Sequence, residues 1–247
     1  MSLLGIIGGS GLTSLEDLEL ERRSAASTRW GRPSGPLLQG RVADRPVVFL
    51  ARHGSDHTLA PHEVNYRANI WALHEAGVRR LVAVNAVGGI GERFRPGALV
   101  VPHQLIDYSW GRAQTFCGQR EQPLQHIDFT APYTPAMRAL LLEGAARAGL
   151  EAIDGGVYAV TQGPRLETAA EIDRLARDGC DLVGMTGMPE ASLARELDME
   201  YACLAVVVNR AAGRGADIHG EFERWLREGM AAARRVIRAV LAGMEPS

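Results

Sequence analysis

The chain has 247 residues, of which 46% are hydrophobic and 23% charged, and its net charge at pH 7 is −2. This balance is ordinary for a globular protein, and it offers neither a basic excess for nucleic acid nor a charged tail for a membrane surface. The cysteines, Cys117, Cys180 and Cys203, form no CxxC pair, which excludes a zinc knuckle and favours reduced thiols in a cytoplasmic protein.

The predicted elements alternate between strands and helices. Segment 1–9 is apolar but short and has no basic lead, so it predicts neither a signal peptide nor a membrane span. Apolar runs predict strands, and apolar spacings of three and four residues predict helices. In chain order we expect strands at 3–7 and 46–51, a helix at 62–76, a strand at 81–84, β-like structure at 97–107, a loop at 111–133, a helix at 135–148, a strand at 156–161, a helix at 168–178, a strand at 181–185, a helix at 189–197, a strand at 201–208 and a closing helix at 221–241.

This alternation predicts an α/β fold: a single domain over 1–247 with a central, mostly parallel mixed sheet flanked by helices. Thr168 with Glu171 matches a capping box at the start of one helix. The loop 111–133 is long enough to indicate a functional role or a subunit contact.

Polar groups follow several of the expected strands. Because ligands bind outside the carboxyl ends of strands in open α/β sheets, these groups could share one cleft. Those suited to an anion are the turn 8–11 with Ser10, the planar fork of Arg52, His53 as a second donor, the Ala86 amide beside Asn85, and the Thr186 hydroxyl. No Walker lysine is present, so the pattern favours free inorganic phosphate over a nucleotide tail.

Two further groups would suit a purine edge, namely the carboxylate of Glu167 and the amide of Asn209. Taken singly, Glu167 is typical of the first turn of a helix and Asn209 is typical of a turn. Only their joint placement with the anion-binding groups favours a functional interpretation.

At this point the sequence resembles a known family, the trimeric purine nucleoside phosphorylases and methylthioadenosine phosphorylases. The resemblance covers nearly the whole chain. Its motifs are residues 6–12 (IIGGSGL), 50–54 (LARHG), 64–73 (VNYRANIWAL), 163–165 (GPR) and 184–190 (GMTxxPE). The first three are particularly similar to the methylthioadenosine branch.

The resemblance implies that phosphate cleaves a purine N-glycosidic bond, giving free base and a ribose 1-phosphate. It implies inorganic phosphate as a co-substrate, no metal or other cofactor, and a homotrimer. The implied phosphate-binding residues are Ser10, Arg52, His53, Asn85, Ala86 and Thr186. The family usually has Thr where this chain has Asn85, so the role of that side chain stays open. Met185 would lie against the ribose, and His126 matches a residue contributed across the trimer interface.

Base choice separates the branches of the family. Methylthioadenosine phosphorylases carry Ser where this chain has Glu167, and Asp-x-Asp where it has Asn209, Arg210 and Ala211. Both departures are similar to 6-oxopurine phosphorylases, in which Glu accepts from N1–H and Asn bonds O6 and N7. The unprotonated N1 of adenine would repel the Glu167 carboxylate, and such a site discriminates by roughly 10⁴ or more. Leu166 precedes this carboxylate in the expected base pocket.

The expected reaction is phosphorolysis of S-methyl-5′-thioinosine to hypoxanthine and 5-methylthioribose 1-phosphate, with Asn209 and His53 as the catalytic residues. Asn209 would stabilise the charge that the purine gains as its bond to C1′ breaks, and no covalent enzyme intermediate is needed. At the sugar 5′ end, Ile218 and Phe222 suit a methylthio group. His219 could instead bond a 5′-hydroxyl or serve as a helix cap.

Other interpretations of the same residues stay open. Within the class, the alternatives are a purine nucleoside phosphorylase acting on inosine or guanosine and a methylthioadenosine phosphorylase. Outside it, the alternative is a non-catalytic nucleoside- or phosphate-binding protein on the same fold. A nucleosidase that uses water is disfavoured by the Arg52-His53 pair.

Overall fold

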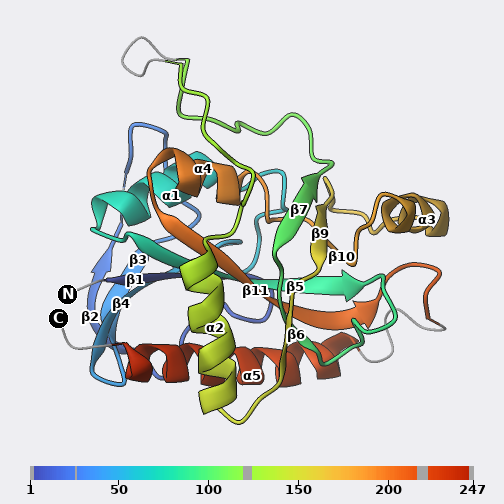
Figure 1. Ribbon diagram of the computed structural model, residues 1–247. Coiled ribbons are helices and arrows are strands. Elements are labelled where there is room, and N and C mark those ends of the chain that lie inside the picture. Colours follow the sequence, from blue (N-terminus) through green and yellow to red (C-terminus); the bar gives the residue numbers. More distant parts are fainter. Residues whose placement is uncertain (1–2, 26, 119–123, 216–221, 245–247) are drawn as a thin grey trace.

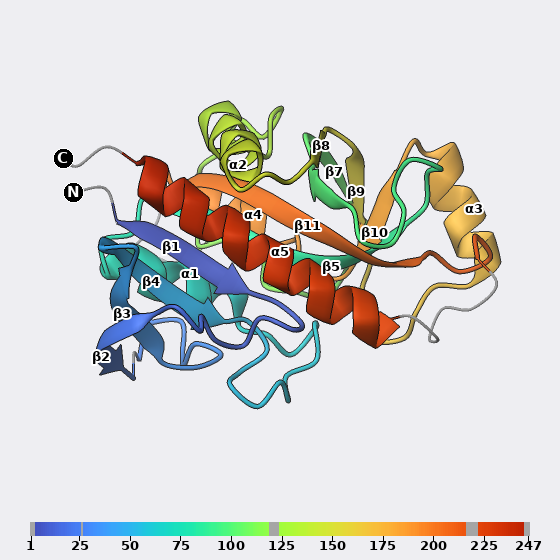
Figure 2. The same ribbon diagram turned by 90° about the horizontal axis from the view of Figure 1, so that it is seen from below.

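The computed structural model describes residues 3–25, 27–118, 124–215 and 222–244, and it places a twisted sheet between two layers of helices (Figure 1). Helices α1 (Tyr66–Glu75) and α4 (Glu190–Glu196) cover one face of the sheet. Helices α2 (Pro135–Arg147) and α5 (Phe222–Gly243) pack together on the other. Helix α3 (Ala169–Arg177) lies at one end, beside β9 and β10 (Figure 2).

All the strands described belong to one mixed sheet. The strands are β1 (Leu4–Gly8), β2 (Glu19–Ser24), β3 (Leu37–Val42), β4 (Arg45–Ala51), β5 (Arg80–Gly89), β6 (Leu99–Val101), β7 (Gln104–Asp107), β8 (Ala152–Asp154), β9 (Val157–Val160), β10 (Leu182–Gly184) and β11 (Glu200–Arg210). The main order is β2-β3-β4-β1-β5-β10-β9-β7, and β11, β6 and β8 branch from β5.

The central strands are apolar on both faces because each face is covered by helices. Side chains alternate along a strand, so neighbouring residues enter different cores. Ile7 of β1 joins the core beneath α1 and α4, whereas Ile6 joins the core beneath α2 and α5. The continuous apolar runs of the sequence therefore correspond to strands buried on both sides.

Strand β5 creates the opening in which a ligand could bind. Strand β11 pairs with β5 along one edge from Arg80 to Gly89. On the other edge, β1 pairs in parallel only up to Val84, and β10 pairs antiparallel at Gly88 and Gly89. The carboxyl ends of β1 and β10 therefore point toward each other across 85–87, which has no strand partner on this edge within the described chain.

The predicted fold class is confirmed, with differences at particular elements. The sequence prediction that strand 81–84 ends before Asn85 was wrong, because pairing with β11 continues β5 to Gly89. Helix α1 begins at Tyr66 rather than 62, since the Asn65 side chain caps it by accepting from the Ala68 amide. Strands β2, β3 and β8 were not predicted. No helix in the described ranges combines the length and apolar character that a bilayer span requires.

Candidate active site

A pocket of about 360 Å³ opens where the ends of β1, β4 and β10 face segment 85–87 of β5. This volume falls in the range of small-molecule sites. The structure brings most of the predicted site residues to it. Those that line the pocket are Ser10, Arg52, His53, Ala86, Leu166, Glu167, Met185, Thr186, Asn209, Ala211 and Phe222.

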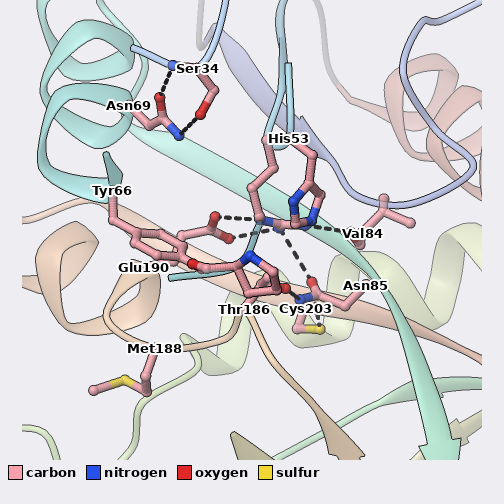
Figure 3. Close-up of polar contacts among 12 residues, drawn as sticks. Ser34, His53, Tyr66, Asn69, Val84, Asn85, Thr186, Met188, Glu190 and Cys203 are labelled. Carbon is pink, nitrogen blue, oxygen red and sulfur yellow. Dashed lines mark hydrogen bonds and ion pairs between the residues drawn. The ribbon is translucent and has the colours of Figure 1, made fainter. Parts of the chain in front are cut away.

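Arg52 and Glu190 form a fully buried ion pair beneath the pocket (Figure 3). Arg52 Nε and Nη2 donate to the two Glu190 carboxylate oxygens at 2.8 and 2.9 Å, and the Tyr201 hydroxyl donates to the same carboxylate at 2.9 Å. Burial alone would lower the pKa of Arg52, but the charge and hydrogen bonds of Glu190 raise it above its ordinary value. The guanidinium is therefore held charged and in one orientation.

The ion pair with Glu190 determines which nitrogen atoms of Arg52 are left to bind an anion. Because Glu190 takes the Nε–Nη2 edge, Nη1 is the end left over, and it donates to the Val84 carbonyl at 3.2 Å. Nη1 also lies against Gly9, where an added Cβ would stand only 2.7 Å away. A glycine is thus required beside the guanidinium, and Nη1 is the part of the fork that Glu190 does not bind.

His53 has its tautomer fixed by the backbone. Its Nδ1 lies 2.8 Å from the Leu59 carbonyl, which can only accept, so Nδ1 carries the hydrogen. Burial, and then the neighbouring Arg52 cation, lower the pKa of His53 to about 4. At neutral pH the ring is uncharged and Nε2 is an acceptor. It therefore fits the hydroxyl of hydrogen phosphate, and not the donor role expected from the sequence.

The His53 ring should titrate with a midpoint near 4 instead of 6.5 in phosphate-free buffer. Since the folded pKa is depressed, the neutral ring contributes stability above about 6.5 that is lost as the pH falls toward 4. Nitrogen-15 NMR of the histidine side chains measures both the midpoint and the Nδ1–H tautomer. A midpoint near 6.5, or an Nε2–H tautomer, would contradict this assignment.

Asn85 lies behind Thr186 and is 1% exposed. Its Nδ2 donates to the Thr186 hydroxyl oxygen at 2.8 Å, and its Oδ1 faces Arg52 Nη2 at 3.5 Å and the Cys203 thiol at 3.4 Å. Both neighbours are donors, because a guanidinium has no acceptor and because burial raises the pKa of Cys203, so that its thiol keeps its hydrogen. These two donors fix the orientation of the Asn85 amide. Because the Thr186 oxygen already accepts, its hydrogen is free to donate into the pocket. Asn85 thus orients the Thr186 hydroxyl from behind the pocket.

Ser10 lies at the glycine-rich turn that follows β1. The Leu12 amide donates to the Gly9 carbonyl, and Gly11 has a φ of +76°, which favours glycine. The Ser10 hydroxyl is 3.3 Å from His57 Nε2, and both residues line the pocket. The turn therefore places a hydroxyl in the pocket that Thr186 also lines.

Glu167 follows β9, which β5 and β10 separate from β1 and β4 in the sheet. The Thr161 hydroxyl donates to Glu167 Oε1 at 2.6 Å. The capping box predicted next to it is confirmed: the Thr168 hydroxyl and the Glu171 carboxylate bond each other's backbone amides. Helix α3 thereby begins directly after Glu167 and fixes its backbone, while Thr161 leaves Oε2 free for a ligand.

Asn209 occupies the end of β11, where a bulge between Val207 and Asn209 shifts the pairing with β5. Its Nδ2 donates to the Arg210 carbonyl at 2.8 Å, which fixes the amide orientation because a carbonyl can only accept. One amide hydrogen and the Oδ1 atom are left for a ligand. Asn209 and Glu167 therefore offer a donor and an acceptor to the same pocket.

Known proteins resemble this chain over nearly its whole length. Residues 3–242 match the model of the phosphorylase superfamily. The chain belongs to this family. It is 53% identical to a probable S-methyl-5′-thioinosine phosphorylase of Pseudomonas syringae pv. tomato, over 98% of this chain and 99% of that protein. It is 45% identical to the 6-oxopurine nucleoside phosphorylase of Pyrococcus furiosus, over 86% of this chain and 81% of that one.

A solved structure of methylthioadenosine phosphorylase from Schistosoma mansoni, in complex with tubercidin, has the same fold. It superposes with a TM-score of 0.91 at 31% identity, covering 98% of this chain and 91% of that one. The likeness therefore extends over nearly the whole of both chains.

Five of the predicted residues do not line the pocket or cannot be placed. Asn85 lies behind Thr186 and does not line the pocket itself. Arg210 points away, because its guanidinium donates to the Gly91 carbonyl at 2.8 Å and pairs with Glu92. His126 is exposed and lies outside this pocket of its own chain. Ile218 and His219 lie outside the described residues.

Sequence reasoning missed the residues that hold the ligand-facing groups in place. Glu190 belongs to the motif at 184–190, but no role for it was predicted from the sequence. The structure places it in the first turn of α4 and buries it fully, which is unusual for a carboxylate. Thr161, Tyr201 and His57 carried no signal of their own. Their roles depend on contacts between distant segments, which no local pattern reveals.

Proposed function

We propose that this chain catalyses the phosphorolysis of S-methyl-5′-thioinosine, giving hypoxanthine and 5-methylthioribose 1-phosphate. The observation that carries the proposal is the contact between Thr161 and Glu167, whose side chain lines the same pocket as Asn209. The hydroxyl donates to Oε1, so the carboxylate is used as an acceptor there, and Oε2 is available to accept again.

A 6-oxopurine matches these groups and a 6-aminopurine does not. Its N1–H donates to Glu167, and its O6 or N7 accepts from the remaining Asn209 amide hydrogen. Adenine presents an unprotonated N1, which would leave the carboxylate facing a lone pair. Such a mismatch of buried polar groups discriminates by roughly 10⁴ or more.

Phosphate binds, in this proposal, at the opposite end of the pocket. The Ser10 and Thr186 hydroxyls, the Ala86 amide and Arg52 Nη1 donate to it, while His53 Nε2 accepts from its hydroxyl. A phosphate oxygen forms the new bond to C1′ as the C1′–N9 bond breaks and its electron pair passes to the purine. The remaining Asn209 amide hydrogen stabilises that charge at N7 or O6, and the base takes its proton from solvent.

The sugar is held between these two ends. Met185 lies next to Thr186 and contributes an apolar surface for the ribose. Phe222, the first residue of α5, lines the pocket and is half-buried, and an aromatic edge suits a thioether sulfur. This supports a 5′-methylthio group over a 5′-hydroxyl.

The names of the relatives point the same way. The Pseudomonas syringae relative is named for methylthioinosine, and the Pyrococcus furiosus relative for 6-oxopurine nucleosides. Both names agree on an oxygen at purine C6. They differ on the 5′ substituent, so inosine or guanosine is the second candidate.

We further propose a single-domain cytoplasmic enzyme that works as a homotrimer with phosphate as co-substrate and without metal, other cofactor or nucleic acid. The segment between β7 and α2 extends from the body at the top of Figure 1 and exposes two large apolar side chains. Trp110 is 70% exposed and Leu124 is 74% exposed, which supports a subunit contact there, with His126 reaching a neighbouring pocket. The free cysteines support a reducing compartment.

A rate comparison tests the function. Methylthioinosine, inosine and methylthioadenosine are each supplied with phosphate, and release of base is followed with and without phosphate. We expect phosphate-dependent turnover with methylthioinosine fastest. Fastest turnover of methylthioadenosine would overturn the roles of Glu167 and Asn209, fastest turnover of inosine would overturn the 5′ assignment, and phosphate-independent release would overturn the phosphorylase.

A further inference from the structure

We propose that Arg112, in the long segment between β7 and α2, is a positioning residue that fixes the base-binding end of the pocket relative to the phosphate-binding end. This inference rests on the proposed function. It concerns a residue that lies outside the pocket lining and acts through backbone carbonyls.

The contacts of Arg112 are unusual in number and kind. Nη1 donates to the carbonyls of Met185 at 2.8 Å and Met188 at 2.6 Å. Nη2 donates to those of Gln162 at 2.9 Å and Thr161 at 3.3 Å. One guanidinium thus satisfies four carbonyls from two segments, and among the described residues it forms no ion pair.

The two segments are those that carry the two ends of the pocket. Thr161 follows β9, and its side chain holds Glu167, the proposed base contact. Met185 follows β10, and its carbonyl shares a peptide plane with the Thr186 amide. By bonding both segments, Arg112 sets the spacing between the groups for the purine and those for phosphate.

The geometry explains why an arginine is needed. The two Nη atoms of a planar fork direct hydrogens to two pairs of acceptors at once, whereas a lysine ammonium offers its donors from a single point. The guanidinium also lies against the ring of Tyr66, with 5.5 Å between its carbon and the ring centroid.

Positioning matters strongly in this reaction because phosphate must approach C1′ while the base is held. Misplacing reacting groups by about 1 Å can cost about 10²-fold in rate. Loss of the Arg112 fork should therefore lower turnover without removing any group that contacts substrate.

The test compares Arg112→Lys with the matched control Arg195→Lys. Arg195 is also half-buried and also donates to two backbone carbonyls, those of Asp128 and Ala131, at 3.1 and 2.6 Å, but neither of these residues lines the pocket. For Arg112→Lys we expect kcat/KM with methylthioinosine to fall about 10- to 100-fold. The KM for phosphate should rise, and the preference for methylthioinosine over methylthioadenosine should narrow because Glu167 is less firmly placed. In the control Arg195→Lys, kcat/KM with methylthioinosine, the KM for phosphate and the preference for methylthioinosine should all stay at their wild-type values.

A second variant separates positioning from stability. Activity of Arg112→Ala should be partly restored by millimolar guanidinium ion, which can occupy the vacated fork, but not by the same concentration of sodium ion. A lower melting temperature with unchanged KM values and base preference would overturn the proposal, as would wild-type kinetics in Arg112→Lys. If the wild-type protein releases base from none of the nucleosides, the proposed function fails by itself. The Arg112 proposal is then decided by the Kd for inorganic phosphate, and an equal Kd in wild type and Arg112→Lys would overturn it.

Discussion

Replacing Asn209 with alanine is expected to lower kcat for the 6-oxopurine nucleoside by about 10²- to 10³-fold, the usual cost of losing one donor to a developing negative charge. The amide is fixed by its bond to the Arg210 carbonyl, so its remaining hydrogen is already oriented before the reaction. That hydrogen bond strengthens as the purine gains charge, so the loss should appear in kcat more than in KM. The KM for phosphate should change little, because the phosphate-binding groups lie at the other end of the pocket.

Asn209→Asp extends the same prediction to base choice. A carboxyl group that takes up a proton can donate to N7, and it no longer offers a fixed amide to O6. Activity toward methylthioadenosine should therefore rise relative to methylthioinosine. Gln104→Glu is the matched amide-to-acid control, since Gln104 also donates to a backbone carbonyl, that of Thr130 at 2.8 Å, and does not line the pocket. An unchanged ratio of the two rates in Asn209→Asp would remove the assigned role.

Much of the fold follows from local patterns. The apolar runs predicted β1, β4 and β11 to within one or two residues, because strands buried on both faces need little else. The spacing of apolar residues in α5 also predicted the buried stripe that contains Met230, Ala233 and Ile237. By contrast, β2 (Glu19–Ser24) is polar and almost wholly exposed, and only its pairing with β3 makes it a strand.

The candidate site was predictable to the extent that it depends on strand ends. Ser10, Arg52 and Thr186 converge because the sheet topology brings the ends of β1, β4 and β10 together. The direction of Arg210 was not predictable. One extra residue at the bulge between Val207 and Asn209 changes which face of the sheet the following side chains of β11 point to. No pattern in the sequence predicts this bulge.

The polar residues of segment 64–73 show the limit of a motif. Asn65 caps α1 and donates to the Trp30 carbonyl, while Asn69 exchanges hydrogen bonds with Ser34, as Figure 3 shows. These contacts hold the loop before β3 onto α1. The motif therefore identifies the family through residues that support the fold, and the ligand-facing groups lie elsewhere.

Removing the Glu190 carboxylate is expected to destabilise the protein by about 3–5 kcal/mol, because the change leaves a buried guanidinium without its counter-charge. Both side chains are fully buried, so solvent cannot replace the lost partner. The Tyr201 hydroxyl would also lose its acceptor. Urea unfolding of Glu190→Ala measures the effect, and a loss of less than about 1 kcal/mol would be typical of a surface pair and would contradict this account.

The double variant Arg52→Met/Glu190→Met separates stability from phosphate binding. Two apolar side chains of similar volume can replace a buried ion pair at little cost, so the double variant should regain most of the free energy of unfolding that Glu190→Ala loses. It should nevertheless bind phosphate poorly, because Arg52 Nη1 is gone. If the double variant is as unstable as Glu190→Ala, packing and not charge explains the loss. If it binds phosphate like the wild type, Arg52 serves the fold alone, and Ser10, Thr186 and the backbone amides carry the anion. The expected result, restored stability without phosphate binding, requires that one guanidinium be held by Glu190 on one edge and be offered to phosphate on the other.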